Sequence, residues 1–153
     1  MNRVLLLHGP NLNLLGRREP EIYGATTLDE INNTLIELGR RRDIEVDAYQ
    51  SNHEGALIDR IQNAAGRYGV CIINPGGYTH TSVALRDAML AVSPELSFIE
   101  VHLSVPESRE DFRHKSLVAD VVQGRISGFG PLSYLLALRA ASELLRQPGA
   151  SAS

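Results

Sequence analysis

The chain has one cysteine, one lysine and no tryptophan among its 153 residues. A lone cysteine excludes an intramolecular disulfide, and the apolar neighbours of Cys71 predict a buried strand thiol rather than a nucleophile. The lysine, Lys115, lies in a polar run, whereas imine chemistry needs a desolvated amine. No apolar run approaches the roughly 20 residues that span a bilayer.

Targeting and charge patterns are also sparse. The short apolar run Val4–Leu7 leads directly into His8-Gly9-Pro10, so we expect no secretory leader and a cytoplasmic protein. The formal net charge is −3, and the cationic residues are scattered apart from Arg40-Arg41-Arg42. Without a basic face, the chain is not expected to have nucleic acid as a partner.

Known cofactor motifs are missing as well. Gly128-Phe129-Gly130 lacks the third glycine of a dinucleotide loop, and there is no phosphate-binding loop or Gly-x-Ser-x-Gly elbow. Histidines and carboxylates show no spacing typical of a zinc or two-metal site. We therefore expect no metal and no organic cofactor, which leaves acid–base chemistry by histidine, tyrosine, arginine and a carboxylate.

What the sequence does contain is an alternation of short apolar runs and amphipathic segments. Continuous apolar runs indicate strands buried on both faces of a parallel sheet. They predict strands over Arg3–His8, Ile44–Gln50, Val70–Asn74, Ser97–His102 and Val121–Ser127. The helices between them are expected from a capping box at Thr27 to about Gly39, over 54–67 and 81–91, in a short piece over 106–112, and from Pro131 onward.

This order of elements predicts an α/β fold with three layers and a five-stranded parallel sheet. The leading topology is flavodoxin-like, with strand order 2-1-3-4-5. Residues 1–146 are expected to form one catalytic domain. The tail 147–153 is rich in Pro, Gly, Ala and Ser, and we expect it to be disordered.

The connection after the first strand, from Gly9 to about Thr26, is longer than the usual 2–6 residues of such loops and is expected to be a lid or binding loop. His8, Asn74 and His102 end three of the strands, at the edge where such sheets bind ligands. Asn11 and His80 are expected to converge on the same face. Taken singly, Asn74 and His80 fit equally well as residues that satisfy loop backbone groups.

Four ordered blocks then resemble the type II 3-dehydroquinase family, at matching spacing over nearly the whole chain. They are His8-Gly9-Pro10-Asn11-Leu12-Asn13-Leu14-Leu15-Gly16-Arg17-Arg18-Glu19-Pro20-Glu21-Ile22-Tyr23-Gly24, Ile73-Asn74-Pro75-Gly76-Gly77-Tyr78-Thr79-His80, Ile99-Glu100-Val101-His102-Leu103-Ser104 and Arg109-Glu110-Asp111-Phe112-Arg113-His114. Departures from the pattern include Val105 and Pro106 after Ser104.

The resemblance implies a lyase that removes water from 3-dehydroquinate, through an enolate and by anti elimination, in the shikimate or quinate pathway. It also implies a homododecamer built as a tetramer of trimers. By motif, Tyr23 is the base, Arg18 its partner on the lid and His102 the acid, supported by Asn11 and Glu100. The residues implied to hold the substrate are Asn74, His80, Asp87, Leu103, Ser104 and Arg113.

These residue types suit the implied chemistry. A tyrosine with a pKa near 10 is rarely ionised at neutral pH unless a cation lowers that pKa, and Arg18 is such a cation. His102 can then protonate the departing hydroxyl. The alternative from another class is a non-catalytic flavodoxin-like binding or signalling module.

Overall fold

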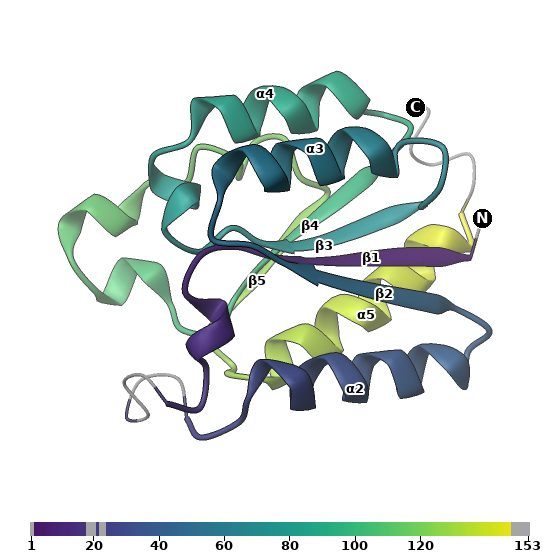
Figure 1. Ribbon diagram of the computed structural model, residues 1–153, viewed down its shortest axis with the longest axis horizontal. Coiled ribbons are helices and arrows are strands. Elements are labelled where there is room, and N and C mark those ends of the chain that lie inside the picture. The colour runs from purple at the N-terminus through teal and green to yellow at the C-terminus, as the bar shows by residue number, and fades with distance from the viewer. Residues whose placement is uncertain (1, 18–20, 22–23, 148–153) are drawn as a thin grey trace.

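The computed structural model describes residues 2–17, 21 and 24–147, and its centre is a five-stranded parallel sheet (Figure 1). The order β2-β1-β3-β4-β5 confirms the predicted flavodoxin-like topology. The strands are β1 (Arg3–His8), β2 (Glu45–Gln50), β3 (Val70–Asn74), β4 (Ser97–His102) and β5 (Gly124–Ser127).

Helices cover both faces of the sheet and make the outer two layers. Helices α3 (Glu54–Ala64) and α4 (Val83–Val92) lie on one face, and α2 (Leu28–Arg40) and α5 (Leu132–Leu145) lie on the other (Figure 1). None of the helices among the described residues is long and apolar enough to cross a membrane.

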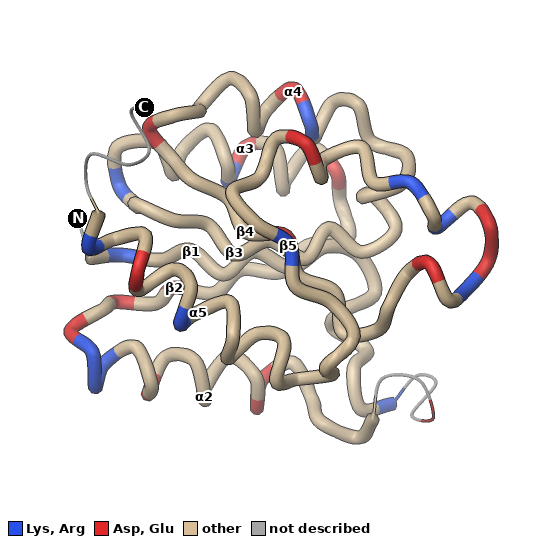
Figure 2. Tube along the Cα trace, turned by 180° about the vertical axis from the view of Figure 1, so that it is seen from behind, with Lys and Arg blue, Asp and Glu red and all other residues tan. Residues whose placement is uncertain are grey.

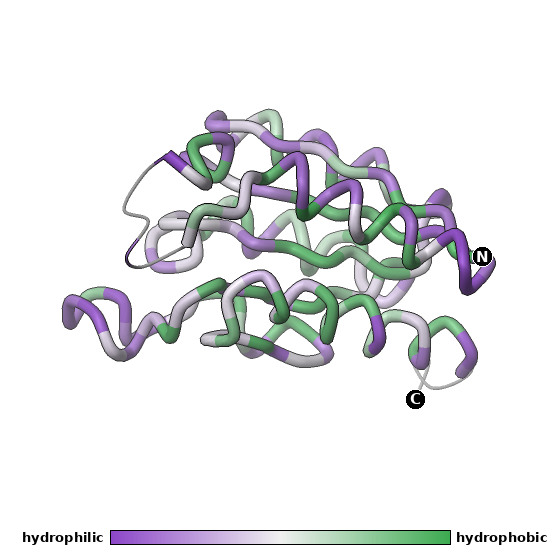
Figure 3. The backbone as a smooth tube through the Cα atoms, turned by 90° about the horizontal axis from the view of Figure 1, so that it is seen from below, coloured by the Kyte–Doolittle hydropathy of each residue, from purple (hydrophilic) through white to green (hydrophobic). Residues whose placement is uncertain are grey.

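Alternating side chains of the strands build a separate core on each face. In β1, Leu5 and Leu7 are buried with α3 and α4, whereas Val4 and Leu6 are buried with α2 and α5. Figure 3 shows hydrophobic residues running along the strands between the helices. This two-sided burial is the reason that the strands read as continuous apolar runs.

Helix starts follow local capping. The Oγ1 atom of Thr27 accepts a hydrogen bond from the backbone N–H of Glu30 (3.2 Å), as the capping box predicts. Helix α4 begins at Val83, two residues later than expected, because Ser82 caps it and the preceding Gly76–His80 forms the 3₁₀ helix η2.

Other boundaries also differ from expectation. Strand β5 begins at Gly124 instead of Val121, because residues 118–121 form a turn, in which the N–H of Val121 donates to the carbonyl of Val118, and residues 122–123 form a bend. Strand β2 begins at Glu45, one residue later than predicted, and α3 ends at Ala64, three residues earlier than predicted. The piece expected over 106–112 is two 3₁₀ helices, η3 (Pro106–Ser108) and η4 (Asp111–His114). Residues 148–153 of the expected disordered tail lie outside the described residues.

The first and third strand-end loops are in direct backbone contact. The N–H of Gly9 donates to the carbonyl of Asn74 over 2.7 Å. A Cβ atom on Gly9 would lie 2.4 Å from the Pro75 carbonyl oxygen, so only glycine fits here. Gly76 has a φ of 60° and packs against Pro10. These close approaches set the spacing between the two loops.

We expect Gly9→Ala to lower the free energy of unfolding by about 1–3 kcal/mol, because its methyl group would overlap the Pro75 carbonyl. Gly55→Ala is the matched control: Gly55 lies in α3 with open space around its Cβ position, so alanine should stabilise the protein by roughly 0.5–1 kcal/mol. Urea denaturation measures both. Equal effects of the two substitutions would show that the loop contact is not tight.

Candidate active site

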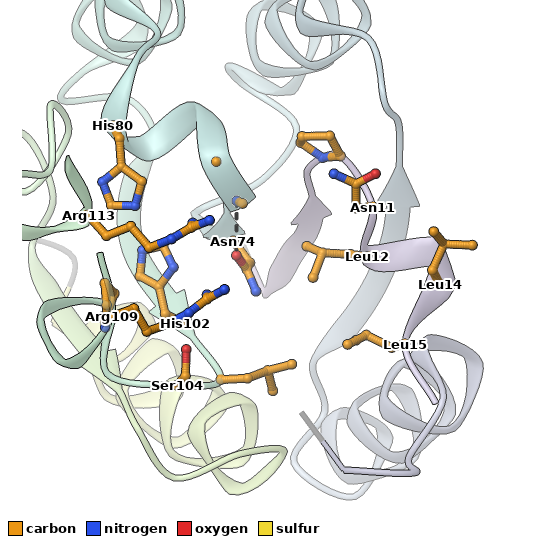
Figure 4. Close-up of a pocket in the computed structure, with 15 residues that line it drawn as sticks. Asn11, Leu12, Leu14, Leu15, Asn74, His80, His102, Ser104, Arg109 and Arg113 are labelled. Carbon is orange, nitrogen blue, oxygen red and sulfur yellow. Dashed lines mark hydrogen bonds between the residues drawn. The ribbon is translucent and has the colours of Figure 1, made fainter. Parts of the chain in front are cut away.

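A cavity of about 130 Å³ opens at the carboxyl edge of the sheet (Figure 4). His8 of β1 pairs in register with Asn74 of β3, and His102 of β4 pairs with Ser127 of β5. Because Ile73 pairs with Glu100, β4 extends one residue beyond β3, so the strand ends lie within one residue of each other. This volume suits a small polar molecule rather than a dinucleotide. Its walls come from the loops after β1, β3 and β4, and are formed by Pro10, Asn11, Leu12, Leu14, Leu15, Asn74, Gly76, Gly77, His80, His102, Leu103, Ser104, Pro106, Arg109 and Arg113.

His102 is oriented from behind by a fully buried carboxylate. The Nε2 atom of His102 lies 2.6 Å from Oε2 of Glu100, two residues earlier on the same side of β4. His102 itself lines the cavity, so the carboxylate holds one ring nitrogen while the ring faces the ligand space. An imidazole held in this way can act as a general acid or base.

Three further side chains surround the Glu100 carboxylate. Thr79 donates its hydroxyl hydrogen over 2.7 Å, and the Ser116 hydroxyl lies 3.1 Å from both oxygens. Arg125 of β5 places its Nε atom 3.2 Å from Oε1. Burial alone would raise the pKa of the Glu100 carboxyl, but the hydrogen bonds of His102 and Thr79 and the charges of His102 and Arg125 leave the pKa below its ordinary value.

Cationic side chains line the same side of the cavity as His102 (Figure 4). Arg109 and Arg113 come from the segment that holds η3 and η4, which protrudes from the molecule and carries charges of both signs (Figure 2). The Nε atom of Arg113 donates to Glu110 over 2.9 Å. Guanidinium groups favour carboxylate or hydroxyl oxygens, so this wall suits an anionic ligand.

His80 is the third polar group of this wall (Figure 4). Its Nδ1 atom donates to the backbone carbonyl of Lys115 over 2.8 Å. That bond assigns the proton to Nδ1 and leaves Nε2 for a ligand.

The long loop after β1 supplies the apolar wall of the cavity and the side-chain amide of Asn11. Asn11 has a φ of 70°, and its backbone N–H donates to the Oδ1 atom of Asn52 over 3.0 Å. The side chain of Gln50 donates to Gly9 and to Asn52, which ties the start of this loop to β2. Asn11, predicted as a functional residue, therefore lies at the cavity in a conformation that asparagine tolerates.

Asn74 continues into a buried chain of hydrogen bonds. Its Nδ2 atom donates to the hydroxyl of Tyr134 (2.9 Å), which lies 3.2 Å from Nδ1 of His8. The Nε2 atom of His8 lies 2.8 Å from Oδ1 of Asn32 on α2. Burial lowers the pKa of His8 to about 4, although the hydrogen bond to Asn32 opposes the shift.

The structure gathers most of the residues that the sequence proposed. Seven of them line the cavity, namely Asn11, Asn74, His80, His102, Leu103, Ser104 and Arg113. Glu100 lies directly behind His102. Asp87 is exposed on α4 and does not line the described cavity of this chain. Arg18 and Tyr23, the expected lid arginine and base, lie outside the described residues.

Sequence reasoning missed the partners of these residues. Arg109 lines the cavity, and its place in the same block as Arg113 was an available signal. Nothing in the sequence pointed to Thr79, Ser116 and Arg125 as neighbours of one carboxylate, because they come from separate segments.

Comparisons with known proteins agree with one another. The family model described as dehydroquinase class II matches residues 2–142. The 3-dehydroquinate dehydratase of Nostoc sp. is 58% identical over 136 residues, covering 89% of this chain and 91% of that protein. That of Geotalea daltonii is 55% identical, covering 90% and 94%. The crystal structure of a type II dehydroquinase from Butyrivibrio crossotus superposes with a TM-score of 0.87 at 45% identity, covering 90% and 95%.

The pKa of His8 predicts a loss of stability in mild acid. An unfolded histidine takes up a proton near pH 6.5, whereas the folded His8 has a pKa of about 4. Between these values protonation favours the unfolded chain, so the free energy of unfolding should fall by about 2 kcal/mol from pH 7 to pH 5 through this group.

Urea denaturation at pH 7 and pH 5 measures that fall, with His8→Gln as the comparison. The variant is expected to be less stable at pH 7 but to lose less stability on acidification. An identical fall in both proteins would assign the pH dependence to other groups.

Proposed function

The chain belongs to the class II dehydroquinase family, and from this membership and its cavity we infer that it is a 3-dehydroquinate dehydratase. This hydro-lyase removes water from 3-dehydroquinate to give 3-dehydroshikimate in the shikimate or quinate pathway. The relatives that match nearly the whole chain carry this name. Nothing in the comparisons supports the alternative, a non-catalytic binding or signalling module.

The observation that carries the chemistry is the contact of His102 with Glu100 at the wall of a cavity lined by arginines. Elimination requires a proton for the departing hydroxyl group. An imidazole held in one orientation by a buried carboxylate suits a general acid. Glu100 keeps its other donors while His102 gives up the proton, so its charge stays compensated.

We propose Tyr23 as the base and Arg18 as the cation that acidifies it. The hydrogen that leaves is bound to carbon beside a ketone, so its removal places charge on the ketone oxygen and forms an enolate. A guanidinium within a few Å can lower a tyrosine pKa by about 1–3 units. The support for both roles is the first motif block, residues 8–24, which resembles the signature of the family whose model matches residues 2–142.

The remaining polar groups are proposed to hold the substrate. Arg113 offers a guanidinium to the substrate carboxylate or hydroxyls, and the backbone amides of Leu103 and Ser104 offer hydrogen-bond donors. Asn74 and His80 are proposed to bind hydroxyl groups. Asn11 is proposed to stabilise the enolate through an ordered water. All six border the same cavity.

The position of Asp87 favours an enzyme assembled from several copies of the chain. It lies on the exposed side of α4 between Val83, which is 59% exposed, and Leu90, which is 46% exposed, at helical spacing. These two exposed apolar side chains flank Asp87 on one face of the helix, where a neighbouring copy would cover them. We propose that Asp87 reaches the substrate of a neighbouring copy within a homododecamer, a tetramer of trimers, in the cytoplasm.

Tyr23→Phe should reduce turnover by at least about 100-fold, because general base catalysis contributes 10²–10⁴-fold. The KM should change little, since the ring remains and only the hydroxyl is removed. The measurement is the ultraviolet absorbance of the conjugated enone product. Turnover within a factor of three of the wild-type value would remove Tyr23 from the role of base.

Leu90→Arg should dissociate the assembly, because it places a charge in the proposed contact surface. Light scattering is expected to show smaller particles, and activity should fall because Asp87 no longer reaches a neighbouring site. Asn33→Arg, exposed on α2 across the sheet, is the matched control and should change neither property. An unchanged mass for Leu90→Arg would contradict the proposed surface.

A further inference from the structure

A chain of hydrogen bonds runs from the cavity wall into the core between β1, β3, α2 and α5. It joins Asn74, Tyr134, His8 and Asn32 over 2.9, 3.2 and 2.8 Å. Asn74 is 3% exposed, and Tyr134 and His8 are fully buried. Each hydrogen bond in such a chain has one donor and one acceptor, so fixing which group donates at one end fixes the donor in every other bond.

The bond between His8 and Asn32 decides which groups donate along the chain. Oδ1 of Asn32 accepts a hydrogen bond, so Nε2 of His8 carries the ring hydrogen. The neutral ring then has a bare Nδ1 atom, which accepts the hydroxyl hydrogen of Tyr134. The pKa of His8, lowered by burial to about 4, agrees with a neutral ring.

The same direction determines what Tyr134 does to Asn74. A hydroxyl that donates to His8 must accept from its other neighbour, and Nδ2 of Asn74 donates to it over 2.9 Å. Independently, Oδ1 of Asn74 accepts the backbone N–H of Gly76 over 3.1 Å (Figure 4). A flipped amide would place donor against donor at Gly76 and acceptor against acceptor at Tyr134, which leaves buried polar groups unpaired.

We propose that Tyr134 and His8 are positioning residues that hold the Asn74 amide in one orientation, so that it presents its second N–H to an oxygen of the substrate. The proposal rests on the proposed function, in which Asn74 binds 3-dehydroquinate. It adds a selection rule: this point of the cavity accepts a ligand group with a lone pair, such as a hydroxyl or carboxylate oxygen, and disfavours one that only donates.

The wild-type protein offers a first test without any substitution. Nitrogen-15 NMR of the His8 ring should show a hydrogen on Nε2 and a bare, hydrogen-bonded Nδ1 at pH 7. A hydrogen on Nδ1 would reverse the chain and overturn the proposal. This measurement needs no enzyme activity, so it stands apart from the test of the proposed function.

Tyr134→Phe is the second test, because it removes only the hydroxyl. Its kcat/KM for 3-dehydroquinate should fall roughly 3- to 10-fold, mainly through KM, the size of effect that one lost hydrogen bond produces. Tyr68→Phe is the matched control: this buried hydroxyl donates to Asp47, away from the cavity, and its loss should leave KM unchanged.

A double-mutant cycle with Asn74→Ala separates positioning from a general structural effect. If Tyr134 acts through Asn74, Tyr134→Phe should change kcat/KM less than 2-fold when Asn74 is already alanine. The proposal would be overturned if the loss of kcat/KM in the double variant equalled the product of the losses in the two single variants. An unchanged KM in Tyr134→Phe would also overturn it. An inactive wild-type protein would instead refute the proposed function and leave the NMR result to decide this one.

Discussion

The carboxyl edge of the sheet depends on one buried negative charge, that of Glu100. A carboxylate removed from water is costly unless it is paired and hydrogen-bonded on all sides. Its partners come from β4, from η2, from the segment after η4 and from β5. Four parts of the chain are thereby held around one group, and one of them carries the imidazole of His102, the proposed acid.

The alternation of side chains along parallel strands gives the enzyme two separate polar networks. Glu100 and His102 point to the same side of β4 and meet Thr79 and Ser116. His8 and Asn74 are paired across β1 and β3 and meet Tyr134 and Asn32 from the helices of the other face. We propose that the first network serves proton transfer and that the second orients a substrate-binding amide.

The two networks lie at a single edge because the strands are parallel and end within one residue of each other. The apolar residues of the strands pack into the hydrophobic cores on both faces of the sheet. In the central strands β1 and β3 the polar groups His8 and Asn74 therefore lie at the carboxyl ends, where loops and helices supply partners. Tight backbone contact at Gly9 and Gly76 keeps two of these loops at a constant spacing.

Sequence by itself determined the sheet order, the edge that carries the site and most residues of the cavity, because apolar periodicity and motif spacing are local properties. It misplaced the starts of β5 and α4, where a turn and a 3₁₀ helix with a serine cap override the apolar pattern. Only the tertiary structure brought Arg125 to Glu100 and Tyr134 to Asn74, across 25 and 60 residues of chain. Such contacts arise from the packing of distant segments, and no local pattern encodes which buried group will meet which partner.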